Sequence, residues 1–194
     1  MKFAETGSKC QTQNTSADRE ALYGFYGPGQ GVIEGKLLWT SQSRIKFLAN
    51  IAEWLNKEDT RPTAYKCIAK ADEIWPDDAS IIDRHFALST MCKVFYRWRD
   101  ADEFALDKAI SACWRSVAMQ HEAAAAFKQP GHALPWGNGL PGHYCFTKLA
   151  IIEEKRGNVS AAIEVCGDAI QGGWPGDWEK RIARLRKKEA KAAK

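Results

Sequence analysis

The chain has 194 residues, of which 45% are hydrophobic and 11% aromatic, and its net charge is +4. This length is enough to bury one good core, so we expect one helical domain. No run approaches the roughly 18 consecutive apolar residues of a membrane span, and Met1 to Gln13 lacks the apolar run of a signal peptide. These features favour a cytoplasmic protein without a membrane partner.

Residues 1–43 differ in composition from the remainder, and we expect them to form an arm that is mostly loop. Glycine and proline break helices, and both are dense in the segment 23–31, YGFYGPGQG. The overlapping stretch 29–37, GQGVIEGKL, resembles a phosphate-binding loop only superficially. Gln30 replaces its first glycine and Leu37 its Ser or Thr, so we expect no nucleotide there.

The first predicted helical hairpin covers about residues 45–76. Apolar side chains recur at three- and four-residue steps along one face of its first helix: Ile45, Leu48, Ile51, Ala52 and Leu55. After a break at 57–61, Pro62 stands where a first-turn proline is tolerated. The second helix then continues to Trp75-Pro76.

The second predicted hairpin covers residues 79–127 and is longer. We expect Asp77-Asp78 to cap its first helix and a single second helix to run over about 102–127. The acidic turn at its start, around Asp100, is typical of a solvated helix start. A connection rich in glycine and proline follows at 129–142, and loops of this length between packed helices are commonly functional or flexible.

Two segments align at an offset of 98 residues, and the second defines a third hairpin at 143–173. In the first segment Leu48-x2-Ile51-Ala52 is followed by Ala64-x3-Ile68 and Pro76, and in the second Phe146-x2-Leu149-Ala150 is followed by Ala162-x3-Cys166 and Pro175. This spacing resembles the tetratricopeptide repeat. The resemblance implies an all-α fold of antiparallel helical hairpins stacked as a short solenoid over 44–194, with the non-helical arm before it.

Small residues have a defined place in this pattern. Ala52, Ala64, Ala150 and Ala162 are expected where the two helices of a hairpin cross closely. Gly157-Asn158 is expected to stop one helix and cap the next. Glu153 departs from the pattern, because the repeat usually has an aromatic residue there.

The last predicted helix, 177–192, resembles the polar helix that closes a repeat stack. Residues 179–194 hold eight of the 28 Lys and Arg and two of the 24 Asp and Glu, a local charge of +6, which leaves −2 for the remainder. This basic patch raises nucleic acid as an alternative partner. Its main members are Arg184, Lys187, Lys188 and Lys191.

The six cysteines are widely spread, without a C-x-x-C pair or zinc-site spacing, and at least four lie in apolar helical patterns. We therefore expect them to pack in the core and predict no metal site and no cofactor. His132, His143 and Cys145 gather around the long loop, but their irregular spacing is weak evidence for a metal. His121-Glu122 lacks the second histidine of a zincin helix, since residue 125 is alanine.

The resemblance implies a helical-repeat interaction module that binds a protein or peptide segment. The expected concave surface is closed by the arm and the 129–142 loop, and the candidate contacts are Phe25, Tyr26, His132, Trp136 and Asn138. No catalytic residue is predicted. A small enzyme with its site under the 129–142 loop remains the second alternative, after nucleic-acid binding.

Overall fold

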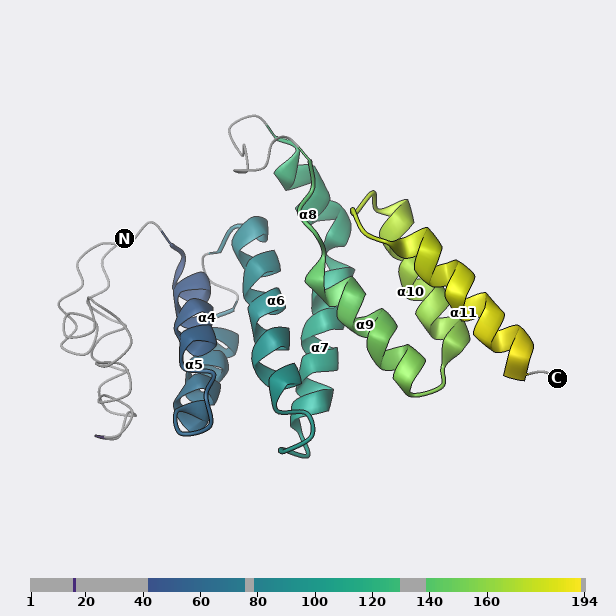
Figure 1. The fold of residues 1–194 in the computed structure, drawn as a ribbon. Helices are drawn as coiled ribbons and strands as arrows, with labels where there is room; N and C mark the ends of the chain where they lie inside the picture. The colour runs from purple at the N-terminus through teal and green to yellow at the C-terminus, as the bar shows by residue number, and fades with distance from the viewer. Residues whose placement is uncertain (1–15, 17–41, 76–78, 130–138, 193–194) are drawn as a thin grey trace. The chain divides into compact units, whose positions relative to one another are not determined.

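The computed structural model describes Ser16 and residues 42–75, 79–129 and 139–192 (Figure 1). The secondary structure of this part of the chain is all helical, which confirms the predicted class. Within it, no helix combines the length and apolar character needed to cross a membrane. The helices are α4 (Arg44–Trp54), α5 (Arg61–Glu73), α6 (Ile81–Arg97), α7 (Ala105–Ala118), α8 (Gln120–Phe127), α9 (Tyr144–Lys155), α10 (Val159–Gln171) and α11 (Trp178–Ala192).

The chain divides into two compact units, residues 1–83 and 84–194, and the boundary falls in the first turn of α6. The sequence predicts one helical domain from residue 44 onward, whereas this boundary falls within that range. The predicted arm over 1–43 lies almost entirely outside the described residues.

In the first unit, α4 and α5 pack against each other as a hairpin. Ser43 caps α4, since its hydroxyl accepts a hydrogen bond from the Lys46 N–H at 3.3 Å. Ala52 and Ala64 have no exposed surface, as their small size at a close crossing requires. Leu48, expected on the buried face, is half-buried, whereas Phe47 and Ala49 beside it are buried.

The second hairpin differs from its prediction at both ends. The described cap of α6 is Ser80, whose hydroxyl accepts from the Asp83 N–H at 3.1 Å, while Asp77-Asp78 lie outside the described residues. The helix expected over 102–127 is interrupted at Met119, where α7 ends and α8 begins. No glycine or proline marks this break, so the apolar pattern predicted a continuous helix.

The third hairpin consists of α9 and α10, which pack against each other. Gly157 ends α9 in a Schellman motif: its φ is +82°, and the Asn158 N–H donates to the Glu153 carbonyl at 2.9 Å. The Asn158 side chain does not cap α10, contrary to the prediction. Its amide donates instead to the Glu153 carboxylate at 2.8 Å, which explains how a carboxylate is tolerated at this buried position.

Ala162 and Ala150 are both fully buried in this hairpin. Replacing Ala162 with leucine should therefore overpack the crossing of α9 and α10 and lower the free energy of unfolding by about 1–3 kcal/mol. Urea denaturation measures this change. An unchanged midpoint would mean that the helices do not cross closely at Ala162.

Helix α11 packs on α10 with its apolar side. Trp178 and Leu185 are buried and Ile182 is half-buried, whereas Lys187 and Lys191 are exposed. The apolar face of this helix therefore covers neighbouring residues, and much of its basic surface faces solvent.

Candidate functional site

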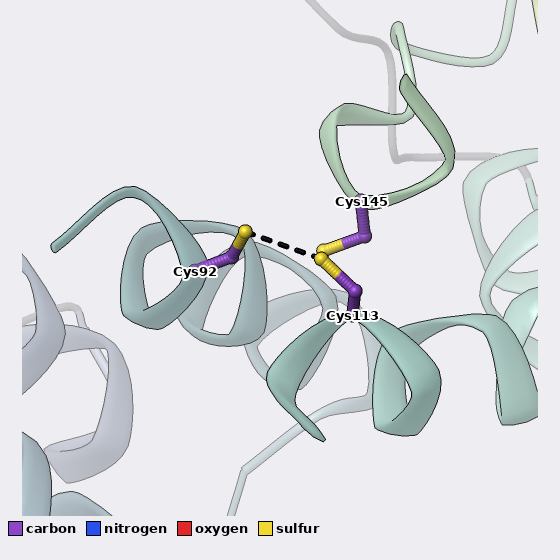
Figure 2. A group of neighbouring side chains, drawn as sticks. All are labelled: Cys92, Cys113 and Cys145. Atoms are coloured by element: carbon purple, nitrogen blue, oxygen red, sulfur yellow. Dashed lines mark hydrogen bonds between the residues drawn. The ribbon is translucent and has the colours of Figure 1, made fainter. Parts of the chain in front are cut away.

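Three cysteines from three helices converge in the core of the second unit (Figure 2). They are Cys92 of α6, Cys113 of α7 and Cys145 of α9, and none has exposed surface. All three Sγ atoms lie within 4.8 Å of one another, and Cys113 Sγ is 3.1 Å from Cys92 Sγ. We call this group the three-cysteine cluster.

The thiols of this cluster differ in acidity. Hydrogen bonds from Cys113 and then from Cys92 hold the pKa of the Cys145 thiol well below its ordinary value. The hydrogen bonds of Cys113 to Cys145 and to Cys92, together with burial, raise the pKa of the Cys113 thiol. A negative charge in the cluster is therefore best accommodated on Cys145.

The hydroxyl of Ser116 lies next to this cluster, one turn along α7 from Cys113. It is buried and makes no hydrogen bond of ordinary geometry among the described residues, but it lies close enough to Cys145 to lower the pKa of that thiol. A buried hydroxyl without a partner is costly, and a thiolate at Cys145 would supply one. Ser116 therefore acts in the same direction as the two neighbouring thiols and lowers the pKa of Cys145.

A second group of buried rings, which we call the aromatic–histidine cluster, consists of His85, Phe127, His143 and Trp174. Its member His143 lies two residues before Cys145 in the sequence. The His85 ring stacks on Trp174 at a centroid distance of 5.3 Å and meets the His143 and Phe127 rings edge-on at 4.8 and 5.5 Å. Burial lowers the pKa of His85, and burial followed by the proximity of His85 lowers that of His143 to about 3. Both imidazoles are therefore neutral at physiological pH.

Local sequence explains how this cluster is assembled. His143 caps α9, since its Nδ1 accepts from the Phe146 N–H at 3.3 Å. Gly173, with φ of +73°, ends α10 in another Schellman motif, in which the Trp174 N–H donates to the Ala169 carbonyl at 3.0 Å. This turn directs the Trp174 indole into the core.

A different feature lies on the surface of α7. The positions Phe104, Asp107, Ser111, Trp114 and Ala118 follow three- and four-residue steps and are all exposed, and we call them the α7 outer face. Phe104 and Trp114 are 49% and 46% exposed, and smaller side chains separate them. Large aromatic side chains that remain accessible on a helix are common anchors of protein interfaces.

Comparisons with protein-family models, with curated proteins and with solved structures find no match.

The predicted basic patch is partly engaged with α9. The Arg184 guanidinium forms a bidentate ion pair with the Glu154 carboxylate, with N–O distances of 2.8 and 2.6 Å. Lys188 Nζ lies 3.7 Å from Oε1 of the same carboxylate. The hydrogen bond from Arg184 lowers the pKa of Glu154. In the described part of the chain, Lys187 and Lys191 have no such carboxylate partner.

The structure brings together few of the residues that the sequence singled out. Phe25, Tyr26, His132, Trp136 and Asn138 all lie outside the described residues. Of the trio considered for a metal, His143 and Cys145 are described, and each belongs to a different cluster.

The three-cysteine cluster escaped the sequence analysis, although the burial of its members was expected. Its residues are 21 and 32 positions apart, so no local spacing marks them. The available signal was that each lies on the apolar face of its helix.

Proposed function

We propose that this chain is a helical-hairpin interaction module, related in design to tetratricopeptide repeats, that binds a protein or peptide segment. The α7 outer face is the described surface best suited to such a partner. The observation that carries this proposal is the accessible indole of Trp114, which projects from a helix whose opposite side is firmly packed.

The chemistry of this face defines the partner. Phe104 and Trp114 are ten residues apart, which corresponds to about 15 Å along a helix. Ser111, which lies between the two aromatic anchors, is small, so a partner backbone can approach α7 there. These properties favour an amphipathic segment with two apolar anchors, bound along α7.

Nucleic acid is a weaker candidate partner. Arg184 of the basic patch forms two hydrogen bonds with the Glu154 carboxylate, so part of the positive charge of α11 is already neutralised. A small enzyme remains the third proposal, with its site under the 129–142 loop.

The test is affinity capture of partners from the native host with the full chain, with and without nuclease, followed by quantitative mass spectrometry. We expect a protein partner that survives nuclease and whose affinity for Trp114→Ala is roughly 30-fold weaker or more, as for an interface hot spot of about 2 kcal/mol. Trp54→Ala is the matched control, because Trp54 is 48% exposed but lies in the first unit.

Two results would contradict this proposal. Recovery of nucleic acid alone would replace it with binding through the basic patch. Equal loss of the partner with Trp114→Ala and Trp54→Ala would show that the α7 outer face has no special role.

A further inference from the structure

We propose that Cys92, Cys113 and Cys145 form a buried binding site for a thiophilic d¹⁰ metal ion, Zn²⁺ or Cu⁺, which joins α6, α7 and α9. This site is separate from the α7 outer face and does not depend on the proposed function. It also departs from the sequence-based expectation that the cysteines only pack in the core.

The donor set defines the class of ion. All three donors are sulfur, and within the described residues no carboxylate or imidazole belongs to the group. Mg²⁺ and Ca²⁺ require oxygen ligands, whereas thiolates select Zn²⁺ and Cu⁺. Three thiolates complete the coordination of a trigonal Cu⁺ ion. A tetrahedral Zn²⁺ ion requires a fourth ligand in addition to the three sulfurs.

The geometry is close to what such an ion needs. With metal–sulfur bonds of about 2.3 Å, the sulfurs of a tetrahedral site lie about 3.8 Å apart. The three Sγ atoms already lie within 4.8 Å of one another, and their side chains point toward a common centre (Figure 2). The 3.1 Å separation of Cys92 and Cys113 has to widen by less than about 1 Å, which side-chain rotation provides.

Ser116 supplies the second, independent observation. Its buried hydroxyl is unpartnered and lies beside Cys145, where it can donate to a metal-bound thiolate. Such outer hydrogen bonds orient metal ligands and typically change affinity by about 10–100-fold. A metal-bound thiolate at Cys145 would accept a hydrogen bond from this hydroxyl. Packing of neutral thiols in an apolar core does not require such a donor.

Binding requires each coordinating thiol to lose its proton to solvent, and the ion takes the place of those protons. No electron is transferred. Because the cluster has no exposed surface, the ion enters during folding or through local opening of the helices.

The test is metal retention by the full chain. Wild-type protein and single Cys→Ser variants are refolded under reductant with Zn²⁺ or Cu⁺, desalted, and assayed for metal per chain, and Co²⁺ replaces Zn²⁺ for absorption spectra. We expect the wild type to retain one ion with sulfur-to-metal charge-transfer absorption. Cys92→Ser, Cys113→Ser and Cys145→Ser should bind at least about 100-fold more weakly, more than the loss of an outer partner.

Cys166→Ser is the matched control, because Cys166 of α10 is equally buried but lies outside the cluster. It should retain the ion. Preference for Zn²⁺ or for Cu⁺ identifies the ion, and either result supports the proposal.

Ser116→Ala keeps the test decisive if the cysteine variants fail to fold. This variant should leave the metal-free protein as stable as the wild type or more so, because it removes an unpartnered buried hydroxyl, yet it should bind metal about 10–100-fold more weakly. Three results would overturn the proposal: no ion retained by the wild type, retention unchanged in the cluster variants, or a Cys92–Cys113 disulfide in metal-free protein purified without reductant.

Discussion

Replacing Trp178 with alanine is expected to lower the free energy of unfolding by about 3–5 kcal/mol. The Trp178 side chain is only 2% exposed, and its indole N–H donates to the Trp174 carbonyl at 2.8 Å. Its ring also meets Phe146 edge-on at a centroid distance of 6.3 Å. Truncation therefore leaves a cavity beside the third hairpin and an unpaired carbonyl. Thermal and urea denaturation both measure this loss.

The control is the combined replacement of Lys187, Lys188 and Lys191 by glutamine. These side chains are exposed, and the one described ion pair among them, from Lys188 to Glu154, is secondary to that of Arg184. Exposed ion pairs contribute little to stability, so the melting temperature should hardly change. If the lysine variant lost more stability than Trp178→Ala, charge rather than packing would hold α11.

Acidification is expected to destabilise the metal-free protein through His143. Above pH 6.5 the imidazole is neutral in both the folded and the unfolded chain, so it contributes no pH dependence. Between pH 6.5 and about 3 the unfolded chain binds a proton that the folded chain does not, because burial and His85 lower the folded pKa to about 3. Stability therefore falls by about 1.4 kcal/mol per pH unit, or about 2 kcal/mol by pH 5, and the loss levels off below pH 3.

His143→Asn separates this effect from packing. Asparagine is a good N-cap and accepts from the Phe146 N–H in place of Nδ1, but it does not titrate. The variant will be less stable overall, since it loses the ring contacts with His85 and Trp174. Its stability should nevertheless vary less steeply with pH, as measured by urea melts at pH 7.5, 6 and 5. An unchanged slope would show that folding does not lower the pKa of His143.

The helix pattern of the chain could be predicted because it depends on local rules. Gly157 was placed correctly as a helix stop, since a residue with positive φ is needed there. The burial of Ala52, Ala64, Ala150 and Ala162 followed from the repeat-like spacing. The stacking of the hairpins into a solenoid stays a prediction.

Other features depend on packing that one sequence does not encode locally. The break at Met119 carries no glycine or proline. The Asn158 amide donates a hydrogen bond to the buried Glu153 carboxylate and therefore does not cap α10. The three-cysteine cluster requires the rotation and register of α6, α7 and α9 to be known together. The expectation of buried cysteines is confirmed for Cys92, Cys113, Cys145 and Cys166, whereas Cys67 is half-buried and Cys10 lies outside the described residues. The proximity of the cluster cysteines to one another could not be foreseen.

Hydrogen exchange of the full chain, with and without its captured protein partner, tests the central claim most directly. If the α7 outer face binds the partner, amide protection should increase over residues 104–118 and remain unchanged over 179–192. Protection confined to 179–192 would contradict the account and assign binding to the basic patch of α11.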